Sequence, residues 1–541
     1  MVLRYKLEYS SNDYGYAKIL DNILKKKETT YKIKKDDEYI TLFVEDEEKS
    51  LLKISDELSK ELPLSIFLKD FALEVVPQIP PENYHNTLDS CQKSYCSNCL
   101  AEIEKKELTS YYNPFISCQI CGTTSNAKSL DIHENNHLQN FKTFKESFEY
   151  LAKKIDENKV VKIKNSQMQF TLKKFKEIEK EQQSLLCTNI DSLSTLVVGS
   201  KQKNIALLSL EKPTIKFNIN TIYKNNHNID FETVNITYPW DLVLYLLSKE
   251  LHILGVNFLV IEEDTKADIE VDYENSITPP KISFCEDRIF LLENSCYEKR
   301  LEEVYNKFEE PSKSHFLVLL DENRLYEKSI LNIFISSKYN DAVTFYNPEI
   351  GGFVDVLDYN LPKNISSIFH DISKMENGKT LLENYQNKFP ELYEQALNSD
   401  ISNLKTKSIS NLWKIAEIVL GIDNIYKKAS HSLLQKGPRI DYKLKQSNKN
   451  FNKEFDFISF IKSGMSFKLA GVDEKTLSLG YVENFFYMLS DLVDSVNEEQ
   501  KLDGISFCGD MIADDFINKL INKTFTKSLK LYYNKDFPIQ L

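Results

Sequence analysis

Residues 96–121 read C-S-N-C-L-A-E-I-E-K-K-E-L-T-S-Y-Y-N-P-F-I-S-C-Q-I-C, and this run carries the strongest local signal in the sequence. Its four cysteines follow the spacing Cys-x2-Cys-x18-Cys-x2-Cys. Two such knuckles supply the four thiolates that Zn2+ binds in a tetrahedron. We therefore expect a zinc site formed by Cys96, Cys99, Cys118 and Cys121. A site closed by four thiolates is structural and stabilises the fold; the alternative is four buried free thiols.

Three residues near this run are further candidate metal ligands. Cys91 is expected to be a free cysteine, although it could compete for the metal. His133-Glu134-Asn135-Asn136-His137 matches His-Glu-x-x-His, which on a helix supplies two zinc ligands and a general base. Asparagine is a poor helix former, so an exposed loop or helix end is favoured and a zinc metalloprotease is a minor alternative. Accessory metal binding by His133 and His137 is a further alternative.

The first 76 residues predict a ferredoxin-like α+β domain. Apolar periodicity predicts the order β-α-β-β-α-β, with strands at residues 3–9, 30–33, 39–44 and 66–76 and helices at 16–27 and 49–62. A proline-rich linker, Val76-Pro77-Gln78-Ile79-Pro80-Pro81, follows the last strand. Beyond about residue 150, helical and strand-like runs alternate to the end of the chain, which indicates α/β or α+β domains with a boundary near residue 310.

The composition of the chain disfavours several classes of function. The chain has 541 residues, of which 42% are hydrophobic, and a net charge of −13. Only 14 residues are glycine, and no G-x-G pattern occurs. Backbone loops that wrap phosphate need glycine, so nucleotide binding through the common loop motifs is disfavoured. The acidic charge opposes nucleic-acid binding, no membrane span is evident, and clustered cysteines indicate the reducing cytoplasm.

The residues around the knuckles resemble a known family. The segments 96–102 and 112–122, with Ile79-Pro80-Pro81 upstream, are similar to the zinc finger of the hydrogenase maturation carbamoyltransferase HypF. The resemblance implies four domains: acylphosphatase-like (1–76), a zinc finger module (77–150), YrdC-like α/β (151–309), and a truncated carbamoyltransferase-like domain of the ASKHA type (310–541). This chain keeps one zinc finger where HypF has a pair.

The positions aligned with the family's phosphate contacts are altered in the first part of the chain. In the acylphosphatase-like domain, Asp13-Tyr14-Gly15-Tyr16-Ala17-Lys18 has alanine where the family's arginine is expected, so bidentate phosphate binding is lost. Lys164 ends a YrdC-like strand, but Asn165-Ser166-Gln167-Met168 replaces the glycine-rich turn. Lys164 is therefore expected to be a solvated lysine. Glu262-Glu263-Asp264 stands where a nucleotide contact is expected and would repel a triphosphate.

The C-terminal part is altered in the same way. Ser410 and Lys414 replace a glycine and an aspartate in a helix that resembles the family's Gly-Arg-Leu-Phe-Asp segment. In Gly504-Ile505-Ser506-Phe507-Cys508-Gly509-Asp510, the aspartate replaces the second glycine of a turn that approaches phosphate. Asp510 thus adds a side chain and a negative charge at that position. No counterpart of the family's metal-binding histidine pair is found.

The resemblance implies a shortened, degenerate HypF, similar to the HydE-type proteins of nickel–iron hydrogenases. We expect a cytoplasmic assembly factor with structural zinc, no catalytic residues and no bound ATP, whose partner is a nickel–iron hydrogenase subunit or another maturation protein. The alternative is an active carbamoyltransferase that uses carbamoyl phosphate and ATP to supply the precursor of the cyanide ligand. A zinc-ribbon nucleic-acid binder is a third class, opposed by the mixed charges of residues 91–121.

Several isolated residues receive structural interpretations. We expect four other cysteines to be buried small apolar residues, His252 to be a packed core histidine, and His315 to begin a strand. Those four cysteines are Cys187, Cys285, Cys296 and Cys508.

Overall fold

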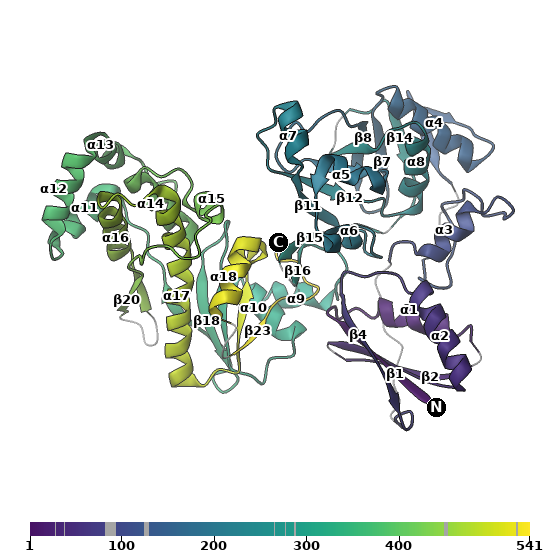
Figure 1. The fold of residues 1–541 in the computed structure, drawn as a ribbon, viewed down its shortest axis with the longest axis horizontal. Coiled ribbons are helices and arrows are strands. Elements are labelled where there is room, and N and C mark those ends of the chain that lie inside the picture. The colour runs from purple at the N-terminus through teal and green to yellow at the C-terminus, as the bar shows by residue number, and fades with distance from the viewer. Residues whose placement is uncertain are drawn as a thin grey trace. The chain divides into compact units, whose positions relative to one another are not determined.

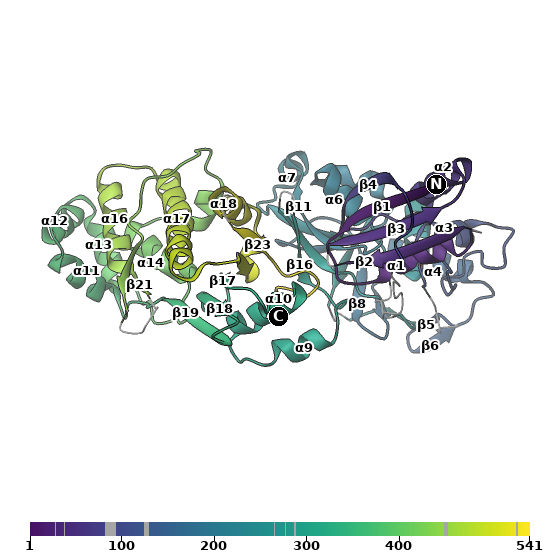
Figure 2. The same ribbon diagram turned by 90° about the horizontal axis from the view of Figure 1, so that it is seen from below.

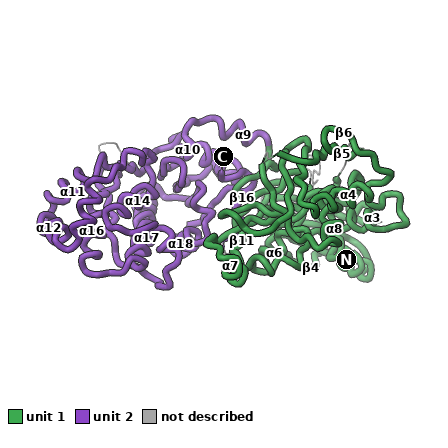
Figure 3. The backbone as a smooth tube through the Cα atoms, turned by 90° about the horizontal axis from the view of Figure 1, so that it is seen from above, with its two compact units in different colours: residues 1–283, 291–298 green, residues 284–290, 299–541 purple. Residues whose placement is uncertain are grey.

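The structure is a computed structural model that describes residues 1–27, 29–36, 38–81, 93–123, 129–263, 266–275, 277–285, 288–447, 453–525 and 529–540. The chain divides into two compact units (Figure 3). Unit 1 contains residues 1–283 and 291–298, and unit 2 contains residues 284–290 and 299–541. The four domain ranges implied by the resemblance stay predictions.

The N-terminal part of unit 1 has the element order that the sequence predicts. Its strands and helices are β1 (Val2–Tyr9), α1 (Gly15–Leu24), β2 (Thr30–Lys35), β3 (Tyr39–Glu45), α2 (Glu48–Glu61) and β4 (Leu68–Val76). The sheet order is β2-β3-β1-β4, and all neighbours are antiparallel; the strands of this sheet are labelled in Figure 2. This is the ferredoxin-like arrangement. The apolar residues of α1 and, in α2, Leu51, Ile54 and Leu58 are buried, as their amphipathic spacing predicts, whereas Leu52 is exposed.

The rest of unit 1 centres on a mixed sheet (Figure 1), which has 12 strands when β15 and β16, partly within residues 284–290, are included. Its strand order is β16-β15-β11-β12-β9-β13-β8-β7-β14-β5-β6, and β10 pairs with β11. The strands are β5 (Asp131–Glu134), β6 (His137–Gln139), β7 (Val161–Lys164), β8 (Gln169–Lys174), β9 (Ser184–Cys187), β10 (Val197–Val198), β11 (Thr214–Ile219), β12 (Thr233–Thr237), β13 (Phe258–Glu262), β14 (Ile269–Asp272), β15 (Lys281–Cys285) and β16 (Arg288–Glu293). The helices are α3 (Ser97–Glu104), α4 (Phe144–Asp156), α5 (Leu193–Leu196), α6 (Lys201–Leu207), α7 (Thr221–His227) and α8 (Leu242–Ile253).

Unit 2 is built on a seven-stranded mixed sheet of order β20-β21-β19-β18-β17-β22-β23. The strands are β17 (Ile330–Phe334), β18 (Ala342–Asn347), β19 (Gly352–Asp358), β20 (Lys443–Gln446), β21 (Lys453–Asp456), β22 (Gly504–Cys508) and β23 (Lys530–Tyr532). The helices are α9 (Arg300–Tyr305), α10 (Pro311–Glu322), α11 (Ile365–Lys374), α12 (Gly378–Lys388), α13 (Pro390–Asn398), α14 (Ile409–Leu420), α15 (Ile425–Ser430), α16 (Phe457–Leu469), α17 (Glu474–Gln500) and α18 (Asp515–Phe525).

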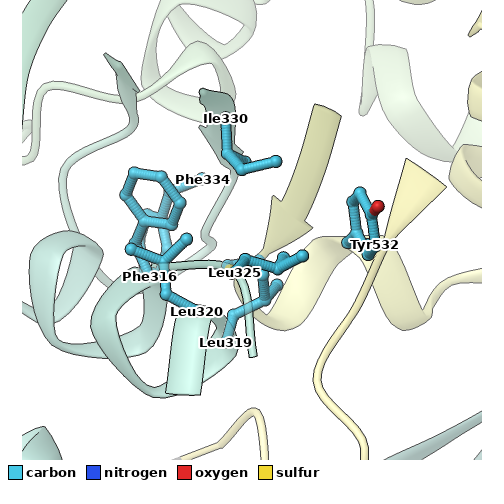
Figure 4. Packing of buried hydrophobic residues seen from close by; sticks show 8 residues of the cluster. Phe316, Leu319, Leu320, Leu325, Ile330, Phe334 and Tyr532 are labelled. Carbon is cyan, nitrogen blue, oxygen red and sulfur yellow. The ribbon is translucent and has the colours of Figure 1, made fainter. Parts of the chain in front are cut away.

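One apolar cluster of unit 2 joins α10 to the strands (Figure 4). Its buried members are Phe316, Leu319, Leu320, Leu325, Ile330, Phe334, Cys508 and Tyr532. The expectation that His315 begins a strand is wrong, because residues 311–322 form a helix with proline at its start. The helix is buried on most sides, and a short apolar run cannot be assigned to strand or helix by periodicity alone.

The structure also bears on His252 and on the predicted absence of a membrane span. His252 lies on α8 but is exposed, so its interpretation as a core histidine is wrong. Within the described ranges, no helix combines the length and the apolar character needed to cross a bilayer.

Candidate functional site

The four cysteines of the two knuckles converge on one point in unit 1. Their Sγ atoms all lie within 4.8 Å of one another, and all four side chains are buried. The Sγ separations are 3.9 Å for Cys96–Cys99, 3.8 Å for Cys96–Cys118 and 3.6 Å for Cys99–Cys121. A tetrahedron with Zn–S bonds of about 2.3 Å places its sulfurs roughly 3.8 Å apart. The described residues contain no other such group of histidine, cysteine or acidic side chains.

Local backbone geometry explains how each knuckle presents its sulfurs. Cys96 is the N-cap of α3, and the amide of Leu100 donates to its carbonyl at 3.3 Å. In the second knuckle, the amide of Gly122 donates to the carbonyl of Cys118 at 3.1 Å. Gly122 has φ +74°, a conformation that strains residues with a Cβ and therefore favours glycine.

Hydrogen bonds and charge fit this cluster to a divalent cation. The amide of Ile120 donates to Cys118 Sγ at 3.4 Å, and Asn98 Nδ2 donates to the same sulfur at 3.6 Å. The hydrogen bond from Cys121 holds the pKa of Cys118 far below its usual value, whereas the hydrogen bond with Cys118 raises the pKa of Cys99. Four thiolates within 4.8 Å of one another would repel strongly, so ionisation of all four requires a cation between them. The donor set fits zinc.

The histidines of the His-Glu-x-x-His segment do not form a site of that kind. His133 lies in β5 and His137 in β6, and the turn between them contains Asn135 and Asn136 with φ of +52° and +64°. His133 is paired with Leu138, and Glu134 with His137. Because side chains alternate between the faces of a strand, the two histidines point to opposite faces of the hairpin. The metalloprotease alternative is wrong, since it requires both histidines on one face of a helix.

The remaining cysteines give a mixed result. Cys187, Cys285 and Cys508 are buried free thiols, as expected. Cys296 is disulfide-bonded, so its interpretation as a packed free thiol is wrong; spacing along the sequence gave no sign of the bond. Cys91 lies outside the described residues.

In unit 2, the side chain of Asp510 is held by a turn after β17. Its carboxylate accepts hydrogen bonds from Ser336 Oγ at 2.5 Å, from the amide of Ser337 at 3.0 Å, and from Ser337 Oγ. Gly509, the residue before it, has φ +97°. The resemblance aligns Asp510 with a phosphate-facing glycine. In this chain a carboxylate occupies the donors of the Ser336-Ser337 turn.

Ser410 lies close to the same turn. Ser410 is the second residue of α14, whose N-cap is Ser408, and its hydroxyl contacts Met511 Sδ at 3.2 Å. Two segments that the resemblance singled out, about a hundred residues apart in sequence, are thus brought together in unit 2. The contact between Ser410 and Met511 joins the two segments directly.

The turn between β7 and β8 in unit 1 is also closed by its own side chain. Asn165 Oδ1 accepts from the amides of Gln167 and Met168 at 3.0 and 2.8 Å. The ammonium group of Lys164 is paired with Glu270, and the hydrogen bond to this carboxylate raises the pKa of Lys164. Lys164 is therefore a paired lysine at the end of a strand. Of the three acids near residue 263, Glu262 pairs with Lys173, and Asp264 lies outside the described residues.

The loop after β1 holds a buried ion pair. Asp13 accepts from the amide of Gly15 at 2.8 Å and lies 2.9 Å from Lys93 Nζ. The two charged side chains are only 7% and 6% exposed. A Cβ on Gly15 would lie 2.6 Å from the Asp13 carboxylate and 2.8 Å from the Lys93 side chain, so a larger residue would force the buried pair to shift. Ala17, at the position of the expected arginine, is buried in α1.

A cavity of about 410 Å3 in unit 2 has mixed charge. Among its lining residues are the cations Lys338, Lys405 and Lys407 and the acids Glu310, Asp341, Asp355 and Asp358. Burial raises the pKa of Asp341 to about 8, and its carboxyl accepts from the amides of Ser336 and Ile409 at 2.9 and 2.6 Å. Such a lining does not concentrate positive charge for a triphosphate.

Comparisons with known proteins give matches along nearly the whole chain. No family model matches it. It is 25% identical over 521 residues to Protein HydE of Wolinella succinogenes, which covers 91% of each chain. The structure superposes on full-length HypF in a phosphate- and nucleotide-bound form with a TM-score of 0.58 and 11% identity, covering 100% of this chain and 96% of HypF. For HypF of T. kodakarensis the TM-score is 0.59 at 10% identity, with 99% and 96% covered.

The chain has the HypF fold. It is also a distant full-length relative of HydE. The HypF resemblance predicted from the zinc finger is confirmed along nearly the whole chain, although only the zinc-finger residues were a specific signal for it. The α/β multidomain class is confirmed as well, with the four-cysteine cluster in place.

Sequence reasoning missed the partners of the altered turns. Ser336 and Ser337 received no role, yet they bind Asp510, which is 174 residues away from Ser336. Lys93 was counted only as one charge of the zinc module, although it neutralises Asp13. The one available signal was the introduced aspartate itself, because an acid beside backbone donors often accepts their hydrogen bonds.

Proposed function

We propose that this protein is a hydrogenase maturation factor of the HypF and HydE kind that acts as a zinc-stabilised scaffold without carbamoyl transfer. The likeness to HydE over 91% of both chains and the HypF fold support the maturation role. Its partner is then a nickel–iron hydrogenase subunit or another maturation protein. Zinc is structural and bound by Cys96, Cys99, Cys118 and Cys121, whose separations fit a tetrahedron.

One observation supports the proposed loss of carbamoyl transfer. At three turns aligned with phosphate positions of the family, backbone amides donate to an oxygen of the chain's own side chains: Asp13, Asn165 and Asp510. A phosphate would have to displace these oxygens and, at two of the turns, overcome repulsion from a carboxylate. The domain assignments 1–76, 77–150, 151–309 and 310–541 belong to this proposal.

The test has two arms on the same zinc-loaded protein. ATP consumption in the presence of carbamoyl phosphate is measured first, and we expect none above the rate without protein. Binding to purified nickel–iron hydrogenase subunits is measured next, and we expect saturable binding. Turnover of ATP that depends on carbamoyl phosphate would favour the active carbamoyltransferase, and failure to bind any hydrogenase subunit or maturation protein would contradict the scaffold.

A further inference from the structure

The two edges of the four-stranded sheet in unit 1 differ in how they are protected. Edge strand β2 carries Lys32, Lys34 and Lys35, and such lysines discourage pairing with another strand. Edge strand β4 has one lysine, Lys69, and no proline among its nine residues. Among the described residues, β4 pairs with β1 alone. One edge of the sheet is thus guarded and the other is available for pairing.

The available edge is apolar on one face. Phe71, Leu73 and Val75 alternate along β4 and are 51%, 49% and 66% exposed. They lie opposite Leu7, Tyr5 and Leu3 of β1, which are buried. Residues opposite each other in an antiparallel pair share a face, so the row on β4 extends the helix-covered core beyond the last strand. The rings of Tyr5 and Phe71 lie 6.1 Å apart.

We propose that β4 pairs antiparallel with β4 of a second copy of this chain, about a two-fold axis that passes through Leu73. The four-stranded sheets of two copies then form one eight-stranded sheet. This inference is independent of the proposed function, because it rests on the strand and not on any partner protein.

The sequence of β4 selects this register. Opposite residues of an antiparallel pair share a face, and side chains alternate between the faces along each strand. A two-fold axis perpendicular to the sheet must therefore place one residue of β4 opposite the same residue of the other copy, and we name the axis by that residue. An axis through Ala72 places Asp70 opposite Glu74 of the other copy, twice, and like charges directly opposite are destabilising. An axis through Glu74 places that carboxylate opposite itself.

The axis through Leu73 avoids these clashes. Leu73 lies opposite its own copy, Phe71 lies opposite Val75, and each of the two acids faces an apolar residue, Val76 or Ala72. The three exposed apolar side chains of each copy are then covered together. An axis through Phe71 is poorer, since Lys69 would lie opposite Leu73 and fewer residues would pair.

Mass measurement of the full-length protein tests the interface. Light scattering after size exclusion is expected to give twice the 63.0 kDa of the chain at micromolar concentration. Leu73→Glu places two carboxylates opposite each other and should weaken the dimer about tenfold or more. Ile222→Glu, at a residue 70% exposed elsewhere in unit 1, is the matched control and should leave the mass unchanged. A wild-type mass of one chain at every concentration overturns the proposal, as does a dimer that Leu73→Glu does not weaken.

Cysteine cross-linking tests the register. Leu73→Cys should form a disulfide-linked dimer on mild oxidation, lost on reduction, because each residue 73 faces its own copy at about 5 Å between Cβ atoms. Ala72→Cys should not, since it faces Glu74. Cross-linking of Ala72→Cys in preference to Leu73→Cys would place the axis elsewhere and contradict the proposed interface. Unchanged thermal unfolding of both variants shows that the chain still folds.

Discussion

The four-cysteine cluster of unit 1 and the Asp510 turn of unit 2 differ in how strongly their polar groups bind one another. In the cluster, four buried sulfurs converge, with neighbouring separations of 3.6–3.9 Å. In the turn, Ser336, Ser337 and Asp510 satisfy one another. The hydrogen bonds between thiols are weak and a metal ion can replace them, whereas the Asp510 carboxylate makes strong hydrogen bonds with the donors of its turn.

The largest expected effect is on the cluster. Cys99→Ser removes one of four ligands, so zinc content should fall from one per chain to near zero and unit 1 should lose much of its folding free energy, because metal binding and folding are coupled. Metal analysis and thermal unfolding measure the two effects. Cys187→Ser, at a buried free thiol, should keep one zinc per chain. Full zinc content in Cys99→Ser would remove that residue from the ligand set.

The next effect concerns the buried pair of Asp13 and Lys93. Lys93→Met leaves the Asp13 carboxylate buried without its cation and should lower the free energy of unfolding by about 3–5 kcal/mol. The double variant Asp13→Asn with Lys93→Met should recover most of that loss, because no charge remains uncompensated. Denaturant unfolding of the two variants tests this. Equal stability of both would mean that the pair does not hold the loop.

Glu322 provides a pH-dependent test in unit 2. Its carboxyl accepts from the amides of Asp536 and Phe537 at 2.8 and 2.7 Å, and burial raises its pKa to about 7. A carboxyl whose pKa is higher in the folded state stabilises the fold below its unfolded pKa, and this contribution is lost as pH rises through 7. The loss between pH 5 and pH 8 is at most about 3 kcal/mol. Unfolding measured across that range should show a shallower decline in Glu322→Gln than in the wild type.

A smaller effect is expected at the Asp510 turn. Asp510→Asn keeps the size of the side chain but removes its charge, so the hydrogen bonds from Ser336 and Ser337 weaken by about 1–2 kcal/mol in total. Asp515→Asn, at an exposed acid paired with Lys519, should change stability by no more than about 0.5 kcal/mol. Urea unfolding compares the two. Equal losses would show that Asp510 is not anchored by the turn.

The smallest effect is expected at Lys164. It is paired with Glu270 near the surface, so Lys164→Ala should cost no more than about 1 kcal/mol and change no ligand binding. A measurable loss of nucleotide affinity in this variant would show that the lysine contacts a nucleotide after all.

Local features of this fold could be read from the sequence, and distant pairings could not. The cysteine spacing and the β-α-β-β-α-β pattern of residues 1–76 involve neighbours, so periodicity and spacing predicted them. Asp510 and Ser336 are far apart in sequence, and no local pattern links them. The apolar run after His315 suits a strand or a buried helix equally, and the proline at position 311 was the unused sign of a helix start.

The His-Glu-x-x-His segment shows how a pattern can mislead. The motif acts only when its histidines share one helical face, and Asn135-Asn136 instead forms a tight turn with positive φ. Sequence reasoning recognised that asparagine opposes a helix but did not predict the hairpin. The same two residues therefore excluded the protease and could have predicted the turn.

Calorimetric titration of magnesium ATP into protein of known zinc content tests the central contrast most directly. We predict one zinc per chain and no binding tighter than about 1 mM, because the chain's own oxygens occupy the turns that would hold phosphate. Micromolar ATP binding by the zinc-loaded protein, or a folded chain without zinc, would contradict the account.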